Sequence, residues 1–195
     1  MSVHNNRNLQ FPKSNFYDEE GVLNLIDGLT NFCVPGTDSI SSSMSFALLY
    51  VSTCRNVLKK IHAEFDAVIG RDRLPDPADR ANMPHMSDVV NDTFRLSSII
   101  PRDVLHSTID ETKVGVHHDE KYWGDPENFR PERFLNADGT LKKEERVIPC
   151  SIGKRVCVAE GLAQVQFFLF LTGVLQRFDF MESPNPYKLI LRERA

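Results

Sequence analysis

The sequence predicts a mainly α fold with minor β, and three features of the chain support this prediction. Apolar residues recur at helical spacing over residues 19–69, a second helical pattern covers 86–100, and a very apolar stretch covers 156–180. Prolines and turn residues separate these segments. With 195 residues, 41% of them hydrophobic, the chain is long enough to bury a core of single-domain size. We therefore expect one domain over 19–195.

The first half of the chain contains two of these helical patterns. Residues 1–18 are polar with little periodicity, so we expect a loop or disordered lead-in there. From Glu19 to Ile69 we expect helix, and Gly70 is a typical helix end. Three prolines make residues 71–85 a turn-rich connector before the next helix, which Pro101 ends.

The second half is irregular before its last helix. Residues 102–146 show no sustained helical period, contain two prolines, and include the turn signal ADGT at 137–140. Residues 156–180 then form a long apolar pattern, which predicts a helix buried on more than one face.

Charge and cysteine content exclude several classes of protein. The formal charge of −4, from 23 Lys+Arg and 27 Asp+Glu, is spread along the chain, so no nucleic-acid partner is expected. The four cysteines contain no C-x-x-C pair and no secretory signal precedes them, which favours a reducing compartment. No apolar run approaches the roughly eighteen residues that cross a bilayer, so we expect a soluble or peripheral chain.

The stretch IPCSIGKRVCVAE at 148–160 carries the clearest chemical signal. It places Gly153, Arg155 and Cys157 at alternate positions just before the last predicted helix. The positive end of a helix dipole and its free N–H groups stabilise a thiolate, so Cys157 is a candidate metal ligand. Gly153 permits a tight turn or a close approach to a flat ligand, and Arg155 can pair with a carboxylate on that ligand.

This stretch resembles the cysteine-ligand signature of the cytochrome P450 family, F-x-x-G-x-R-x-C-x-G. Gly153, Arg155 and Cys157 occupy the expected positions, whereas Cys150 stands in place of Phe and Ala159 in place of the last Gly. The loss of the aromatic ring next to the ligand sulfur is the larger change. The ordinary alternative is that Cys157 is a buried structural thiol.

Three other segments resemble the same family and follow in its order. KYWGDPENFRPERFLNADG at 121–139 is similar to the region before the haem loop, NFCVPGTDSISSS at 31–43 to the oxygen-binding helix, and VVNDTFRLSSIIP at 89–101 to the helix with the E-x-x-R pair. Together they resemble the C-terminal portion of the cytochrome P450 fold, as in an animal microsomal, family-2-like member. Residues 19–195 would be a partial cytochrome P450 domain.

The resemblance implies haem b (iron protoporphyrin IX) as cofactor, with Cys157 as the axial ligand of the iron. Arg155, Gly153 and His106 would be cofactor-binding residues, His106 by contact with a haem propionate. The catalytic residues would be Asp38 and Ser39, which pass protons to dioxygen in this family. Ser39 stands in place of the usual Thr, and Pro35, in place of a small residue, is expected to kink the helix.

The resemblance also implies a structural charged cluster of Asp92, Arg95 and Arg133. Asp92 and Arg95 occupy the E-x-x-R positions, three apart on one helix face, and Arg133 belongs to the P-E-R-F block. Asp in place of Glu shortens the reach by a methylene, so the cluster is expected to be weaker or bridged by water. Outside this family, an i,i+3 Asp/Arg pair is usually a solvated surface pair.

Metal sites of other kinds receive little support. His117 and His118 are adjacent, and neighbouring side chains on an extended segment point to opposite faces. A zinc site that combines these histidines with Cys150 and Cys157 lacks the usual paired spacing.

The family resemblance implies a haem-thiolate monooxygenase that inserts one oxygen atom of O2 into an apolar small molecule. Its electrons would come from a reductase of the NADPH-cytochrome P450 reductase type, and an intact member would lie on the cytosolic face of the endoplasmic reticulum membrane. The anchor and most of the substrate pocket would precede Phe32, and about fifteen family residues are lacking between Thr112 and His117. The alternative is therefore a catalytically inactive fragment that at most binds haem or a partner.

Overall fold

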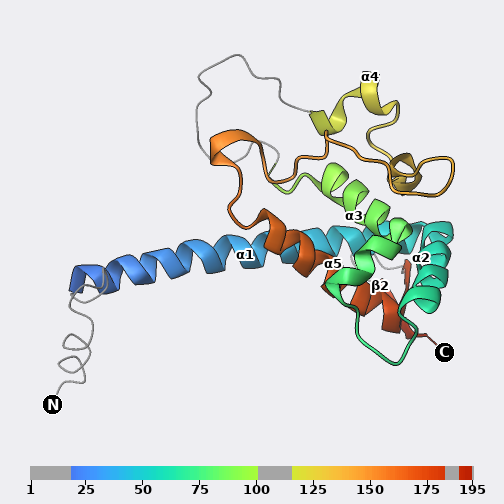
Figure 1. Ribbon diagram of the computed structural model, residues 1–195, viewed down its shortest axis with the longest axis horizontal. Helices are drawn as coiled ribbons and strands as arrows, with labels where there is room; N and C mark the ends of the chain where they lie inside the picture. The colour runs from blue at the N-terminus through green and yellow to red at the C-terminus, as the bar shows by residue number, and fades with distance from the viewer. Residues whose placement is uncertain (1–18, 101–115, 183–188, 195) are drawn as a thin grey trace. The chain divides into compact units, whose positions relative to one another are not determined.

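The computed structural model describes residues 19–100, 116–182 and 189–194 (Figure 1). The predicted lead-in at 1–18 and the candidate residue His106 lie outside the described residues. The chain divides into two compact units, Met1–Ser39 and Ile40–Ala195, and helix α1 (Glu19–Thr53) contributes to both. The mainly α fold with minor β is confirmed, since the described elements are helices and one two-stranded sheet.

Helix α1 begins with Glu19 and Glu20, whose charges complement the positive end of the helix dipole. It continues through Pro35 as one helix, so the proline does not interrupt it. The hydroxyl of Ser39 donates to the carbonyl oxygen of Pro35 over 2.7 Å, one turn back along the helix. Most large apolar side chains between Glu19 and Ser39 are exposed.

The predicted single helix over 19–69 is wrong at Cys54, where the structure breaks it into α1 and α2 (Arg55–Val68). The hydroxyls of Ser52 and Thr53 donate to the carbonyls of Leu49 and Tyr50, three residues back, at 2.7 and 2.8 Å. Such side-chain bonds compete with the helix's own bonds and favour its end. The apolar period continues across the break, which is why the sequence alone does not reveal it.

Helix α3 (Pro84–Ser97) follows a connector that contains the 3₁₀ helix η2 (Pro77–Asn82). Pro84 occupies the first turn of α3, where its lack of an N–H costs nothing. The carboxylate of Glu64, on α2, accepts hydrogen bonds from the backbone N–H groups of His85 and Met86, each over 2.8 Å. A side chain from another helix therefore caps α3.

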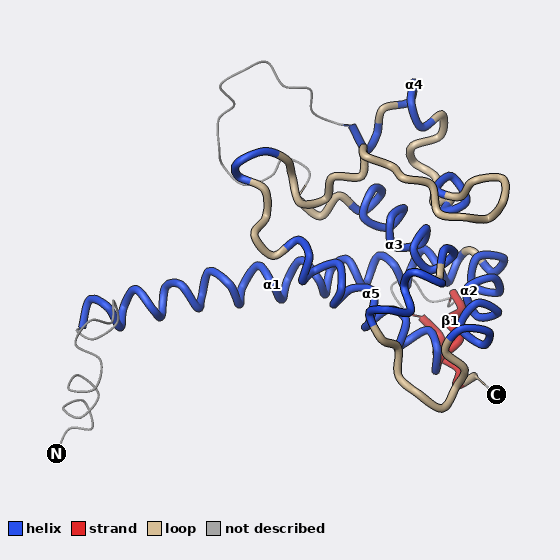
Figure 2. Tube along the Cα trace, in the orientation of Figure 1, coloured by secondary structure: helices blue, strands red, loops and turns tan. Residues whose placement is uncertain are grey.

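The apolar stretch at 156–180 is divided between helix α5 (Glu160–Arg177) and strand β1 (Phe178–Glu182). β1 pairs antiparallel with β2 (Leu189–Glu193), with Phe180 opposite Leu191 (Figure 2). The prediction of helix through Phe180 is wrong. Residues 178–180 pair with β2 instead, and a helical pattern reports only on neighbours within a few positions, so it cannot reveal this pairing. Leu162 and Val165 in the first half of α5 are exposed, so this part of the helix buries one face rather than several.

Residues 116–142 form short turns instead of long elements, as their prolines and glycine predicted. They comprise the 3₁₀ helix η3 (Val116–His118), α4 (Glu120–Trp123), the 3₁₀ helix η4 (Pro131–Phe134) and a bridge between Leu135 and Leu141. The segment packs on α3 through η3 and η4.

The core of the second unit lies between α2, α3, α5 and β1, with Ala47 and Val51 from the last turns of α1. Helices α2, α3 and α5 lie together in Figure 1. Phe65 of α2, Val89 of α3 and Phe167 of α5 are fully buried in it. The rings of Phe94 and Phe167 join α3 to α5, with centroids 4.7 Å apart. Among the helices of the described ranges, none is long and apolar enough to span a bilayer.

Candidate functional site

A buried ion pair lies on the side of α3 that faces the 116–142 segment. The Nε–H of Arg95 donates to Oδ1 of Asp92 over 2.6 Å, and both side chains are 0% exposed. The other carboxylate oxygen of Asp92 accepts the backbone N–H of Arg130, also at 2.6 Å. The structure thus brings the predicted pair into direct contact without a bridging water, because the shorter Asp still reaches Nε one turn away.

The guanidinium of Arg95 also holds the irregular segment in place. Its Nη1 donates to the carbonyls of Pro126 and His117 at 2.5 and 3.2 Å, and its Nη2 donates to the carbonyl of Asn128 at 3.1 Å. Carbonyls in an irregular segment lack ladder partners, so a fork of N–H donors can satisfy several at once. Arg95 therefore joins the short elements and turns of residues 117–128 to helix α3.

Arg133 completes the predicted cluster from the 3₁₀ helix η4. Its Nε lies 3.5 Å from Oδ1 of Asp92, and only 6% of its side chain is exposed. Its two terminal nitrogens donate to the carbonyls of Trp123 and Asn128, each over 3.1 Å. Asp92, Arg95 and Arg133 are accordingly brought together, with Asp125 as a further carboxylate 3.2 Å from Arg133.

Burial and pairing act on this cluster in opposite directions. Burial raises the pKa of Asp92, while the hydrogen bonds from Arg95 and from the Arg130 backbone act to lower it. Burial lowers the pKa of Arg133. The ring of Trp123 lies beneath both guanidinium groups, with centroids 5.3 Å from Arg95 and 5.7 Å from Arg133. The face of the Trp123 ring thus adds a cation–π attraction for Arg95 and Arg133, which share the carboxylate of Asp92.

The cysteine-bearing loop turns sharply before α5. Gly153 has φ of +84° and Ser151 has φ of +66°, both in the left-handed region. The backbone N–H of Cys157 donates to the carbonyl of Cys150 over 3.0 Å and closes the turn. Gly153 thus adopts a conformation that favours glycine, and the turn presents Cys157 at its end.

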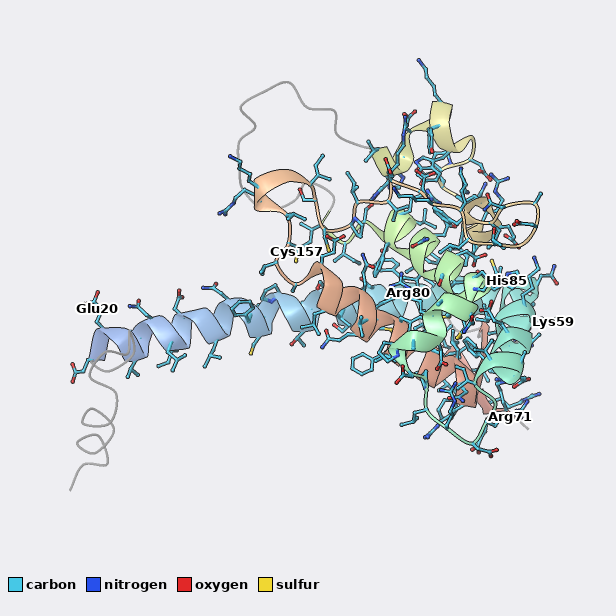
Figure 3. The ribbon with its side chains drawn as sticks, in the orientation of Figure 1. Glu20, Lys59, Arg71, Arg80, His85 and Cys157 are labelled. Carbon is cyan, nitrogen blue, oxygen red and sulfur yellow. The ribbon has the colours of Figure 1, made fainter. Side chains whose placement is uncertain are left out.

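Cys157 lies on the segment that leads into α5 and is exposed (Figure 3). Helix α5 begins at Glu160, later than the predicted start at Val156, and the N–H of Glu160 donates to the carbonyl of Cys157 over 3.3 Å. In the part of the chain that the structure describes, no side chain caps the first turn of α5. The reading of Cys157 as a buried structural thiol therefore disagrees with its exposure.

The surroundings of Cys157 fit a flat apolar ligand that carries carboxylates. Val158 is 85% exposed, and Ile152 and Leu162 are each 61% exposed. Lys154 and Arg155 are exposed cations in the same loop. A soft sulfur ligand, apolar side chains and nearby cations together match the donor set of a haem with its propionates.

Asp38 and Ser39 lie on α1 in the first unit. Asp38 is exposed, and the Ser39 hydroxyl bonds to Pro35 as described above. Their segment is regular α-helix throughout.

The paired histidines lie in a 3₁₀ turn rather than on an extended segment. His117 Nδ1 lies 2.9 Å from the hydroxyl of Ser98, and His118 Nδ1 lies 3.1 Å from Oε1 of Glu127. Sequence reasoning overlooked His117 and Trp123 as members of the site. Trp123 belongs to the quoted KYWGDPENFRPERF stretch, so that similarity was an available signal, whereas nothing local indicated the contacts of His117.

Comparison with known proteins identifies the family. Residues 17–193 match the family described as Cytochrome P450. The chain is 40% identical to cytochrome P450 1A1 of Rattus norvegicus over 168 residues, which is 77% of this chain and 32% of that protein. It is 35% identical to cytochrome P450 1A2 of Homo sapiens over 190 residues, which is 88% of this chain and 36% of that protein.

The chain spans about a third of the length of these relatives. Both carry a family-1 designation, so the expected likeness to family 2 is a small error within a correct assignment. The match covers nearly all the described residues, including the charged cluster and the cysteine-bearing loop. The chain belongs to the cytochrome P450 family, whose members are haem-thiolate monooxygenases.

Proposed function

We propose that this chain provides the haem-binding part of a monooxygenase, with the Sγ of Cys157 as the axial ligand of haem b. The observation that carries the proposal is the exposed Cys157 at the end of a glycine-dependent turn, among exposed apolar side chains. Bound haem supplies the activation of dioxygen, which a thiolate ligand promotes by donating electron density.

The residues of the loop each have a role in this proposal. Cys157 donates its thiolate, Arg155 pairs with a propionate, and Gly153 lets the backbone approach the macrocycle. His106 contacts a propionate as well. Arg95 and Arg133 hold the segment that precedes the loop, because they donate hydrogen bonds to its carbonyls. Asp92 pairs with both guanidinium groups and accepts the backbone N–H of Arg130.

Asp38 and Ser39 are the proposed proton-transfer residues. A carboxylate and a hydroxyl one residue apart can take up a proton from solvent and pass it on. The exposure of Asp38 supports the first of these steps. The Ser39 hydroxyl donates to Pro35 within the helix, so it must leave that bond before it can donate elsewhere.

The proposed partners are O2, an apolar small-molecule substrate and an electron donor of the NADPH-cytochrome P450 reductase type, with no nucleic acid. The proposed location of the whole protein is the cytosolic face of the endoplasmic reticulum membrane. These follow from family membership.

A test of ligation needs the chain, haem, a reductant and carbon monoxide. The purified chain is loaded with haem, reduced under carbon monoxide and examined for the absorption band of thiolate-ligated haem. We expect the band in the native chain and its loss in Cys157→Ser, with Cys150→Ser as the matched control that retains it. A native band that persists in Cys157→Ser would refute the proposed ligand.

A second candidate function is a catalytically inactive chain that binds haem or a partner only. The extensive exposed apolar surface favours it, because Val158, Leu162 and Phe170 leave uncovered an area that a complete pocket would bury. Product formation with a reductase and O2 decides between the two candidates. A thiolate band without turnover supports the inactive chain.

A further inference from the structure

His117 links helix α3 to the cysteine-bearing loop through both ring nitrogens. The backbone N–H of Ile148 lies 2.9 Å from Nε2 of His117, and Nδ1 of the same ring lies 2.9 Å from the hydroxyl of Ser98. Ser98 follows the last residue of α3, whereas Ile148 opens the turn that leads to Cys157. One side chain therefore connects two segments far apart in the sequence.

The donors and acceptors of this link determine the tautomer of His117. A backbone N–H can only donate, so Nε2 accepts from Ile148 and the ring proton resides on Nδ1. Nδ1–H then donates to the Ser98 hydroxyl, which in turn donates to the carbonyl of Arg95 over 2.9 Å. Every polar atom in this chain of bonds has a partner of the right kind.

The neutral form of His117 is favoured by its environment. Burial, aided by the charges of His118 and Arg95, lowers its pKa to about 4. An imidazolium would carry a proton on Nε2 and could not accept from Ile148. The link is therefore present at neutral pH.

Beyond Ile148, two backbone hydrogen bonds close the turn that carries the cysteine. The carbonyl of Ile148 accepts the N–H of Ser151, over 3.3 Å, and the carbonyl of Cys150 accepts the N–H of Cys157. The backbone carbonyl of His117 accepts a hydrogen bond from Nη1 of Arg95. His117 thus lies between the charged cluster and the turn that carries Cys157.

We propose that His117 is a positioning residue, whose doubly hydrogen-bonded imidazole holds the backbone at Ile148 so that the turn presents the Cys157 thiol in one orientation. This inference rests on the proposed function for its consequence in haem ligation. The hydrogen bonds of His117 join atoms of the protein alone, so their effect on the backbone at Ile148 can be measured without haem.

The first test measures amide hydrogen exchange by NMR in the full chain without haem. A Gln side chain places its amide near the position of Nε2, and an Asn side chain places it near that of Nδ1. We expect His117→Gln to protect the Ile148 amide nearly as well as the native residue, and His117→Asn and His117→Phe to accelerate its exchange about tenfold or more. The Cys157 amide should follow the same order.

The matched Gln and Asn variants keep the test decisive if His117→Phe does not fold. Equal exchange of the Ile148 amide in the Gln and Asn variants would overturn the inference, as would native protection in a folded Phe variant. Ser98→Ala leaves the imidazole in place but removes the partner of Nδ1. It should accelerate Ile148 exchange less than His117→Asn does.

The second test uses the carbon monoxide spectrum of the haem-loaded chain. We expect a smaller thiolate-ligated fraction in His117→Phe and His117→Asn, with recovery in His117→Gln. An unchanged fraction in all three variants would overturn the positioning role. Absence of the band from the native chain would refute the proposed function instead, and the exchange test would still decide the position of the loop.

Discussion

Asp92 accepts a hydrogen bond from the Nε–H of Arg95 over 2.6 Å, and the side chains of both residues are fully buried. The pair is three residues apart on one helix, a spacing that on a surface contributes little. Here both side chains have further partners, because Asp92 also accepts the Arg130 N–H and Arg95 also donates to three carbonyls. The pair is therefore an organiser of the neighbouring segment.

Neutralisation of Asp92 should strongly destabilise the fold. Asp92→Asn leaves Arg95 and Arg133 buried without their shared carboxylate, and loss of one member of a buried pair typically costs about 3–5 kcal/mol. Urea unfolding at pH 7 measures the change. Glu145→Gln is the control, since its ion pair with Lys143 is well exposed and should leave the midpoint unchanged. Equal effects of the two substitutions would show that the buried cluster contributes no more than a surface pair.

Neutralisation of Asp88 should have the opposite effect. The Asp88 side chain is 3% exposed, and burial, with the nearby charges of Glu132 and Glu64, raises its pKa to about 8 from 3.8. Between these values the folded chain holds a proton that the unfolded chain has released, so stability falls as pH rises.

Asp88→Asn removes this titration. The variant should exceed the native chain in unfolding free energy at pH 8 by on the order of 2–5 kcal/mol, and the difference should shrink toward pH 4. Urea unfolding at pH 5, 6.5 and 8 measures it. A difference that is constant across this range would contradict the raised pKa.

His62 should make the fold sensitive to acid. Burial is the main cause that lowers its pKa to about 4 from 6.5, and its Nε2 is buried without a hydrogen-bond partner among the described residues. As pH falls from 6.5 to 4, the unfolded chain gains a proton that the folded chain does not. The stability present above pH 6.5 is therefore lost within this window.

Replacement of His62 by Phe keeps a ring in the site and removes the titration. The unfolding free energy should then decline less steeply with falling pH, by at most about 1.4 kcal/mol per pH unit. His118→Gln is the control, because His118 is exposed. Parallel pH curves for native and His62→Phe chains would argue against a buried neutral histidine.

Two glycines near Cys157 should respond oppositely to alanine. A Cβ at Gly153 or at Gly161 would meet no atom within 4 Å, so only backbone conformation differs. Gly153 has φ of +84°, and Gly153→Ala should cost about 1 kcal/mol. Gly161 lies within α5, and Gly161→Ala should stabilise by about 0.5–1 kcal/mol. Urea unfolding without haem measures both, and changes of the same sign would contradict the assigned turn.

Local patterns predicted much of the fold and of the site. The apolar period located α2, α3 and α5, since it reports which residues share a helix face. The sequence likewise shows directly the spacing of Gly153, Arg155 and Cys157 and that of Asp92 and Arg95. The helix break at Cys54 and the strand at Phe178–Glu182 could not, because the same apolar residues suit either arrangement.

The sequence by itself determined the helical class, the family and the residues proposed for haem ligation, because each depends on neighbours within a few positions. Only the tertiary structure decided that Asp92 and Arg95 are buried, that Glu64 caps α3 and that His117 holds Ile148. The contacts of Glu64 and His117 join residues 21 and 31 positions apart, and the contact of Asp92 with Arg130 joins residues 38 positions apart. They depend on how the chain folds back on itself, and the apolar periodicity of a single segment carries no information about that.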